Sequence, residues 1–249
     1  MAGKRFGKAI IVGASSGIGA ETAKLLAHGG CAVALVARRE GELNVLAEAI
    51  RAAGGTAFVY PHDVSDFGDV PALFQQICRD LGGLDAIFYA AGVMPRIAVD
   101  EYDFAKDRAM IEVNVLGAVA WLNEAAVRFA ATEAGTIVGI GSVAGDRGRR
   151  GQPVYCTSKA ALETYLEALR NRVGRVGVKV VTIKPGPVDT PMTRGLDKLP
   201  LMILAEEAAR QIVAASERGA RVAYVPGVWR YVMAIIRAIP SAIFQKMNI

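Results

Sequence analysis

The chain has 249 residues, of which 53% are hydrophobic and 21% charged, and its formal net charge is +5. A chain of this size and apolar content can bury a large core, and we find no linker-like, repetitive or low-complexity stretch in it. A basic balance suits anionic ligands, an anionic membrane surface or nucleic acid. The basic residues are scattered and accompany no nucleic-acid-binding motif, so we do not expect nucleic acid as a partner.

The cysteines and histidines argue against two kinds of site. Cys31, Cys78 and Cys156 are odd in number and lack the spacing of metal ligands, and the two histidines lie far apart in the sequence. We therefore expect a reducing compartment, with neither a disulfide framework nor a metal site. The apolar run after Lys8 leads into a glycine-rich loop instead of a cleavage site, so we expect no signal peptide and a cytoplasmic protein.

Short β-branched runs alternate with longer helical patterns along the chain, which is typical of βαβ units. Strands are predicted over residues 9–12, 32–36, 57–60, 86–89, 136–140, 179–183 and 222–225. Helices are predicted over residues 17–27, 42–51, 70–80, 106–130, 154–173 and 205–217. Together they predict an α/β, Rossmann-like, doubly wound sheet of seven parallel strands with helices on both faces. We expect one catalytic domain over residues 1–227 and an extension over residues 228–249.

The first predicted strand runs into a glycine-rich loop directly before a helix, Gly13-Ala14-Ser15-Ser16-Gly17-Ile18-Gly19. Gly13 permits a tight turn, Gly17 lets the backbone approach a phosphate, and Gly19 lets the helix pack close to the strand. The helix N-terminus offers free N–H groups and a positive dipole end to a pyrophosphate. A glycine pattern alone has low specificity, so an ordinary strand-to-helix turn is the alternative. We predict that the whole loop binds a dinucleotide.

The end of the second predicted strand indicates which dinucleotide binds. An acidic residue there would hold the ribose 2′-hydroxyl of NAD, but Ala37 is followed by Arg38 and Arg39. Arginines pair with a 2′-phosphate through charge-assisted hydrogen bonds, so we predict NADP(H) over NAD(H). The alternative, a solvated helix start, is disfavoured because cations oppose the helix dipole there. Asp63, beside Val64 after the third strand, either accepts from the adenine amino group or caps its own loop.

Tyr155 and Lys159 stand four residues apart near the start of a long predicted helix, so they share one helix face. A nearby ammonium lowers the pKa of a phenol from about 10 toward neutral pH and makes it a usable acid and base. Ser142, at the end of the preceding strand, is placed to hydrogen-bond a substrate oxygen. Asn114, in the long central helix, is placed to hold a water that links Lys159 to solvent. Each residue type is commonly structural by itself, so the prediction depends on the combination.

In these features the sequence resembles the classical short-chain dehydrogenase/reductase family, from Lys8 to about Val225. The further matching motifs are Ala90-Ala91-Gly92, Asn114-Val115-Leu116-Gly117, Ser142 thirteen positions before Tyr155, and Pro185-Gly186-Pro187-Val188-Asp189-Thr190. The resemblance implies that Tyr155 exchanges a proton with the carbonyl or alcohol oxygen, that Lys159 lowers the tyrosine pKa and binds the nicotinamide ribose, and that Ser142 polarises the substrate oxygen. It also implies that Asn114 completes the proton path.

The resemblance further implies cofactor contacts from two segments after later strands. These contacts would come from Ala91, Gly92, Pro185, Gly186, Val188 and Thr190. Three positions depart from the family pattern. Tyr89-Ala90 stands where Asn-Asn is common, Val12 replaces a frequent threonine, and Gly141 replaces the common serine before Ser142, which is expected to leave room near the site. None of them removes a member of the catalytic set.

Two segments bear on the substrate. An apolar stretch follows Gly186 and includes Leu196, Leu199, Leu201, Met202, Ile203 and Leu204. It favours a lipophilic ketone or alcohol, unless these residues pack on the core. A basic loop over residues 146–150 either attracts an acidic substrate or a phosphopantetheine carrier, or is only solvated.

Residues 228–249 form an apolar and basic tail. An apolar helical stripe consists of Trp229, Val232, Ile236 and Ile239. Arg237 and Pro240 interrupt the tail well short of the ~20 apolar residues that a membrane-spanning helix needs. Peripheral contact with a membrane is one expectation, and packing on this chain or a second subunit is the other. A homo-oligomer, dimer or tetramer, is also expected, because family members often pair through their two long helices.

The sequence therefore predicts an NADP(H)-dependent oxidoreductase that acts on a carbonyl or secondary alcohol of a lipophilic small molecule. A 3-oxoacyl thioester reductase, whose arginine loop would meet an acidic carrier, is the second enzymatic possibility. A cofactor-sensing or scaffold protein on the same fold is the non-enzymatic possibility, since fold does not fix function. It is disfavoured because Ser142, Tyr155 and Lys159 are all present.

Overall fold

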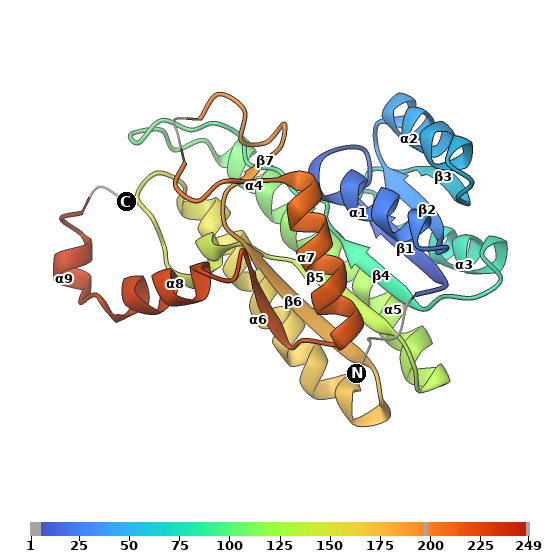
Figure 1. Cartoon of the computed structure of the whole chain (residues 1–249). Coiled ribbons are helices and arrows are strands. Elements are labelled where there is room, and N and C mark those ends of the chain that lie inside the picture. Colours follow the sequence, from blue (N-terminus) through green and yellow to red (C-terminus); the bar gives the residue numbers. More distant parts are fainter. Residues whose placement is uncertain (1–5, 197–198, 248–249) are drawn as a thin grey trace.

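Seven parallel strands form the central sheet of the protein (Figure 1). In spatial order they are β3 (Ala57–Pro61), β2 (Ala32–Ala37), β1 (Lys8–Val12), β4 (Ala86–Tyr89), β5 (Thr136–Ile140), β6 (Lys179–Pro185) and β9 (Val222–Val225). The chain order reverses between β1 and β4, which makes this pair the topological switch point. The predicted doubly wound α/β sheet is confirmed.

The structure, a computed structural model, describes residues 6–196 and 199–247. Residues 1–5 and 197–198 of the predicted catalytic domain, and residues 248–249 of the predicted extension, lie outside the described residues.

Helices cover both faces of the sheet because its strands are apolar on both sides. On one face lie α1 (Gly17–His28), α2 (Glu40–Ala52) and α7 (Ala205–Arg218), and on the other α3 (Val70–Asp80), α5 (Gly117–Thr132) and α6 (Pro153–Val173). Successive strand residues point to opposite faces. Ile11 therefore packs in the first core and its neighbour Ile10 in the second, and both are fully buried.

The long central helix contains a π-helical turn that the sequence pattern did not predict. α4 (Phe104–Ile111) continues through the π turn Glu112–Leu116 into α5. The buried Tyr89 hydroxyl at the end of β4 donates to the Val113 carbonyl within this turn at 2.6 Å. A Cβ on Gly117 would lie 2.6 Å from the same hydroxyl, so the glycine makes room for it. Tyr89 thus satisfies a carbonyl of the π turn, and such turns are frequent at functional sites.

The segment after β6 folds back on itself through a second, two-stranded sheet that was also not predicted. β7 (Val188–Asp189) pairs in parallel with β8 (Ile203–Leu204) immediately before α7. The Thr193 hydroxyl donates to the carbonyls of Val188 and Thr190 at 2.7 and 3.0 Å and so closes the turn after β7. The predicted apolar stretch is therefore held close to the end of β6.

The C-terminal tail packs on the body of the protein as two helices, α8 (Trp229–Ala238) and α9 (Ser241–Phe244). Trp229 and Met233 are buried against Val143. Arg147 clamps the tail, because its Nη1 donates to the Ile236 and Ile239 carbonyls at 2.5 and 2.6 Å. Its guanidinium also lies 4.0 Å from the centroid of the Phe244 ring. One arginine of the predicted basic loop is therefore engaged by the tail.

The segment Phe104–Thr132 is long and apolar enough, by length and composition, to cross a membrane. Its residues Trp121, Leu122 and Phe129 are fully buried under the sheet, so we identify it as a core helix. The three cysteines, all within the described part of the chain, are free and buried. Among residues 6–196 and 199–247, no group of three or more His, Cys, Asp or Glu side chains is placed to hold a metal ion.

Candidate active site

A cleft of about 980 Å³ runs along the carboxyl ends of the strands, from the loop after β1 to α8. Every predicted site residue except Asn114 lines it. These residues are Gly13, Ser15, Ser16, Gly17, Ile18, Gly19, Arg38, Arg39, Asp63, Val64, Ala91, Gly92, Ser142, Tyr155, Lys159, Pro185, Gly186, Val188 and Thr190. The topology thus brings together residues that the sequence distributes over most of the chain.

At one end of the cleft the glycine loop allows backbones to approach closely. Gly13 has a φ of 90°, and a Cβ there would lie 2.4 Å from the Ala91 nitrogen. A Cβ on Gly19 would lie 2.2 Å from the Gly13 carbonyl oxygen. Neither position can accept a side chain without moving backbone, so β1, the loop after β4 and α1 meet at a contact that requires glycine. The cradle that results opens onto the N-terminus of α1, as a dinucleotide pyrophosphate requires.

Two arginines border this cradle at the end of β2. Arg39 Nη2 donates to the hydroxyls of Ser15 and Ser16 at 2.8 and 2.7 Å, so it joins β2 to the glycine loop. Arg38 Nη1 lies 3.2 Å from Asp63 Oδ2 and is three-quarters exposed. Burial disfavours the Asp63 carboxylate, but hydrogen bonds from Ser65 and Arg38 hold its pKa below its ordinary value. Asp63 therefore both caps its own loop and orients an arginine.

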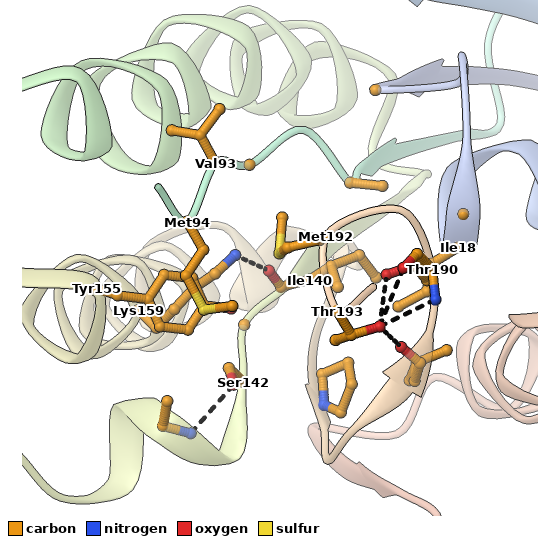
Figure 2. A pocket seen from close by; sticks show the side chains of 18 of the residues that line it. Ile18, Val93, Met94, Ile140, Ser142, Tyr155, Lys159, Thr190, Met192 and Thr193 are labelled. Atoms are coloured by element: carbon orange, nitrogen blue, oxygen red, sulfur yellow. Dashed lines mark hydrogen bonds between the residues drawn. The ribbon is translucent and has the colours of Figure 1, made fainter. Parts of the chain in front are cut away.

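In the middle of the cleft, Ser142, Tyr155 and Lys159 face one another from two elements (Figure 2). Tyr155 and Lys159 lie one turn apart on α6, and Lys159 Nζ lies 5.8 Å from the centroid of the tyrosine ring. The ammonium donates to the Ile140 carbonyl at the end of β5 at 2.9 Å. The Ser142 hydroxyl accepts from the Ala144 N–H at 3.1 Å and begins the 3-10 turn Val143–Asp146. A phenol, an ammonium and a hydroxyl thus surround one small volume.

A sequence model described as short chain dehydrogenase matches residues 7–199. The chain belongs to this family. A cis-4-hydroxycyclohexanecarboxylate dehydrogenase from Sinomonas cyclohexanicum is 34% identical over 216 residues, which cover 86% of this chain and 85% of that protein. An uncharacterized oxidoreductase from Mycobacterium tuberculosis is 30% identical and covers 96% of both chains.

Solved structures of short-chain dehydrogenases have the same fold. One from Mycobacterium marinum superposes with a TM-score of 0.80 at 28% identity and covers 88% of this chain and 93% of that one. One from Sphingobium yanoikuyae, in complex with NADPH, has a TM-score of 0.81 at 24% identity and covers 94% and 97% of the two chains. As a short-chain dehydrogenase the protein is an oxidoreductase that acts on CH–OH and C=O groups with a nicotinamide cofactor.

Burial controls the acidities in this dehydrogenase site. It raises the pKa of Tyr155 to about 12, although the neighbouring Ser142 hydroxyl lowers it. It also lowers the pKa of Lys159 to about 8. The expected lowering of the Tyr155 pKa toward neutrality is therefore not observed, because burial moves this pKa in the opposite direction. The Lys159 ammonium donates to the Ile140 carbonyl, and loss of solvation, which disfavours the phenolate, is the largest effect on the pKa of Tyr155.

Asn114 does not line the cleft and is fully buried in the π turn. Its Oδ1 accepts from the Val93 N–H at 2.8 Å, and its Nδ2 donates to the Val93 carbonyl and the Ser158 hydroxyl, both at 3.0 Å. It therefore ties the loop after β4 to α6. A Cβ on Gly92 would lie 3.3 Å from Asn114 Oδ1 and 3.5 Å from Lys159 Nζ, so the unsubstituted side of Gly92 faces both atoms.

The far end of the cleft is apolar and includes residues that the sequence analysis did not assign to the site. Met94 and Met192 point into it (Figure 2), together with Leu196 and Leu199 of the predicted apolar stretch. The tail contributes Trp229, Val232 and Ile236 from the inner face of α8. Their helical spacing indicated a buried stripe, but no sequence pattern specified which surface it would cover.

A second group that sequence reasoning missed lies beneath Ser142. The room expected beside Gly141 is filled by the Glu163 carboxylate, because a Cβ on Gly141 would lie 2.5 Å from Glu163 Oε1. Glu163 follows Lys159 by four residues on α6, and this spacing was the available signal. A polar residue at that spacing is too common to identify without the glycine that admits it.

Proposed function

We propose that the protein is an NADP(H)-dependent enzyme that interconverts a ketone and a secondary alcohol on a lipophilic small molecule. The observation that supports this most strongly is the convergence of Ser142, Tyr155 and Lys159 in one cleft, between the glycine cradle and an apolar end. A chain kept only as a scaffold or cofactor sensor would have little use for that set. This argues for catalysis over the non-enzymatic alternative.

Each catalytic side chain has a role that follows from its chemistry. The bound cofactor supplies or accepts the hydride. In carbonyl reduction Tyr155 donates its phenolic proton to the developing alkoxide, and its high pKa keeps it protonated until then. Ser142 donates a hydrogen bond to the same oxygen. Lys159, close to its titration point near pH 8, stabilises the tyrosinate and binds the nicotinamide ribose.

Asn114 would serve the proton path. A water on the open side of Gly92 would lie within reach of Asn114 Oδ1 and Lys159 Nζ. Protons would pass from that water through Lys159 to Tyr155 after each turnover. The geometry supports this role because Asn114 is held rigidly by Val93 and Ser158.

The preference for NADP(H) follows from Arg38 and Arg39. Arg39 is already oriented by Ser15 and Ser16, and its Nη1 also lies 3.6 Å from Glu42 Oε1. Arg38 is oriented by Asp63, so both guanidinium groups are held at the cradle. The remaining cofactor contacts are proposed from the glycine loop, from Asp63 and Val64 on the adenine side, from Ala91 and Gly92, and from Pro185, Gly186, Val188 and Thr190 on the nicotinamide side. The solved Sphingobium dehydrogenase, by its description, binds NADPH.

A lipophilic substrate suits the methionine- and leucine-lined end of the cleft. One observation favours a second candidate, a substrate that also carries an anionic group. Arg149 lines the cleft, and its charge lowers the pKa of Tyr155, so it acts at the reacting centre. A carboxylate, as in the substrate that names the Sinomonas relative, or the acidic phosphopantetheine carrier of a 3-oxoacyl thioester would pair with it.

Two further expectations concern partners. We expect a cytoplasmic homo-oligomer that pairs through α5 and α6, since Leu116 and Val127 are exposed large apolar side chains at and beyond the π turn. We also expect peripheral membrane contact through the outer face of α8, where Tyr231 and Ile235 are about 70% exposed. Residues 228–249 include three basic and no acidic residues, which suits an anionic lipid surface.

The test is consumption of NADPH and NADH by the purified full chain across a panel of ketones. The panel runs from small polar ketones through 4-oxocyclohexanecarboxylate to long-chain and steroid-like ketones and a 3-oxoacyl thioester. Highest kcat/KM with NADPH on the lipophilic members is expected. Preference for the carboxylated or thioester members would favour the second candidate, and NADPH binding without turnover of any member would favour a sensor.

A further inference from the structure

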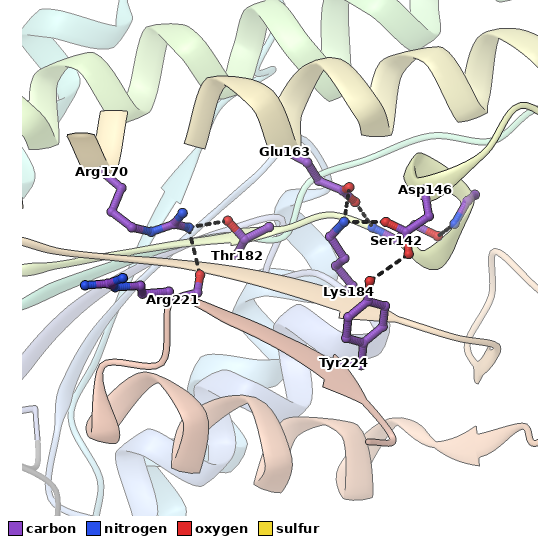
Figure 3. Close-up of polar contacts among 9 residues, drawn as sticks. Ser142, Asp146, Glu163, Arg170, Thr182, Lys184, Arg221 and Tyr224 are labelled. Carbon is purple, nitrogen blue, oxygen red and sulfur yellow. Dashed lines mark hydrogen bonds and ion pairs between the residues drawn. The ribbon is translucent and has the colours of Figure 1, made fainter. Parts of the chain in front are cut away.

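Glu163 is a buried carboxylate in direct contact with the backbone of Ser142. Only 9% of the residue's surface is exposed. Its Oε1 accepts from the Ser142 N–H at 3.0 Å, and its Oε2 lies 2.8 Å from the Lys184 ammonium of β6 (Figure 3). One carboxylate therefore connects α6, the loop after β5 and β6 immediately beneath the catalytic serine.

Lys184 extends this contact to the other end of the serine loop. Its ammonium lies 2.5 Å from Asp146 Oδ1, and Asp146 Oδ2 accepts from the Tyr224 hydroxyl of β9 at 2.8 Å. Asp146 ends the short turn that Ser142 begins. The loop is thus held at Ser142 by Glu163 and at Asp146 by Lys184. Two carboxylates share one ammonium, so the cluster carries a net negative charge when all three groups are ionised.

Two glycines are required to admit the Glu163 carboxylate. A Cβ on Gly141 would lie 2.5 Å from Oε1, and a Cβ on Gly145 would lie 2.7 Å from both carboxylate oxygens. A side chain at either position would displace the carboxylate from this place, so Glu163 and the two glycines form one arrangement. An isolated charge in this position would be costly to bury, and the arrangement supplies both an ammonium and a backbone donor for it.

We propose that Glu163 is a positioning residue of the active site, which fixes Ser142 through its backbone N–H and supplies a buried negative charge beside Tyr155 and Lys159. This inference rests on the proposed function, because it assigns a role relative to that catalytic set. Glu163 is not among the residues that line the cleft, so it would act through the residues it holds.

The charge of Glu163 affects both catalytic groups in the same direction. It opposes the burial that lowers the pKa of Lys159, and it adds to the burial that raises the pKa of Tyr155. The other charged or titratable groups that act on Glu163 or on these two residues are Lys184, Asp146 and, next to Tyr155, Cys156 and Arg149. Burial raises the pKa of Glu163 itself, whereas Lys184 and the Ser142 N–H favour its charged form.

A neutral residue at position 163 should therefore change the pH profile. Without the negative charge, Lys159 and Tyr155 both lose their protons at lower pH. Carbonyl reduction needs the protonated phenol, so the alkaline limb of kcat should move to lower pH by at least about 0.5. A residue with only a structural role would lower stability and leave this limb in place.

The experiment compares three variants of the full chain with NADPH and the panel ketone that turns over fastest. Glu163→Gln removes the charge, and its amide cannot satisfy both the Ser142 N–H and the Lys184 ammonium without placing donor against donor. Glu163→Asp keeps the charge but shortens the side chain. Arg170→Met is the matched control: Arg170 lies seven residues along α6 and also ties it to β6, because it donates to the Val180 carbonyl at 2.8 Å. It also donates to the Thr182 hydroxyl at 2.7 Å (Figure 3).

We expect Glu163→Gln to lower kcat about ten-fold, with little change in KM and the alkaline limb displaced. Glu163→Asp should lower kcat and leave the alkaline limb of the pH profile at its wild-type position. Arg170→Met should lower only the Tm. A Glu163→Gln enzyme within two-fold of wild type, with a superimposable pH profile, would overturn the inference. If that variant does not fold, a Glu163→Asp enzyme with wild-type kcat would overturn it instead.

Amide hydrogen exchange at Ser142, measured by NMR, separates this inference from the proposed function. Exchange at Ser142 should be at least about ten-fold faster in Glu163→Gln than in wild type or Arg170→Met, whether or not any ketone turns over. Unchanged exchange would contradict the positioning role. Turnover that survives Tyr155→Phe would contradict the proposed function and leave the exchange result to decide the role of Glu163.

Discussion

At the glycine-loop end of the cleft, backbones of three neighbouring segments approach so closely that Gly13 and Gly19 have no space for a Cβ. At the opposite end, side chains meet from the loop after β4, the segment after β7 and the C-terminal tail. The first end is specified by local sequence and a topology that many chains share. The second depends on how three distant segments pack. We infer that the cofactor end determines what chemistry is possible, and that the substrate end determines what molecule undergoes it.

Removing the ammonium of Lys159, which lies in the middle of the cleft between these two ends, should have the largest effect on catalysis. We expect Lys159→Met to lower kcat by about 10²- to 10⁴-fold, because the tyrosinate loses its stabilising ammonium. Since burial lowers the pKa of Lys159 to about 8, wild-type activity that depends on the ammonium should fall as pH rises through this value. Steady-state rates from pH 6 to 10 check both points. A variant with more than a tenth of the wild-type kcat would contradict the assignment.

The cofactor end can be tested alone by removing its two cations. We expect Arg38→Ala/Arg39→Ala to raise the KM for NADPH about 100-fold, because two charge-assisted hydrogen bonds to a 2′-phosphate are lost. The KM for NADH should stay within a few-fold, and relative activities over the ketone panel should not change. An equal rise in the KM for NADPH and for NADH would mean that the two arginines only support the glycine loop.

The substrate end offers a matched pair of variants on the two faces of α8. On the inner face, Val232→Ala/Ile236→Ala should lower kcat/KM for long-chain ketones about ten-fold and leave small ketones unaffected, because apolar contact area is lost. On the outer face, Tyr231→Ala/Ile235→Ala should leave kcat/KM unchanged for both long-chain and small ketones. It should reduce co-sedimentation with phosphatidylglycerol vesicles. Equal effects of both pairs on catalysis would indicate general destabilisation of the tail, and wild-type sedimentation of the outer pair would remove the membrane proposal.

The smallest effect is expected from the clamp that holds the tail. Arg147→Met should lower the free energy of unfolding by about 1–2 kcal/mol, because hydrogen bonds to the Ile236 and Ile239 carbonyls and the contact with Phe244 are lost. Denaturant titration measures this, with Arg150→Met in the same basic loop as the control. A full loss of NADPH turnover would instead place Arg147 in the reaction.

The same contrast between the two ends explains how far the sequence allowed prediction. The seven strands and the glycine cradle follow from periodicity and from motifs that act over a few residues, and the structure places them as expected. The spacing of Tyr155 and Lys159 was informative because a helix fixes which residues share a face. The predicted direction of the shift in the Tyr155 pKa was wrong, because the shift depends mainly on burial. Burial depends on every element around the phenol and has no local sequence signal.

The features that the sequence did not predict are all tertiary. The π turn that carries Asn114 depends on the Tyr89 hydroxyl and on Gly117, which lie on different elements. The β7–β8 pair has only two residues in each strand and no recognisable periodicity. Gly141 was expected to leave an open space, yet the carboxylate of Glu163 fills it, and Glu163 lies on α6, 22 residues further along the chain. Contacts between residues so far apart in the sequence can be identified only when the positions of both residues are known.

The role of Tyr155 as proton donor is tested most directly by single-turnover hydride transfer. NADPH absorbance is followed after enzyme, in saturating excess over NADPH, is mixed with the panel ketone that turns over fastest. Wild type is compared with Tyr155→Phe, and NADPH binding is measured in both by fluorescence. We expect unchanged NADPH affinity and hydride transfer at least about 10²-fold slower in the variant. Equal transfer rates at equal affinity would show that Tyr155 is not the proton donor.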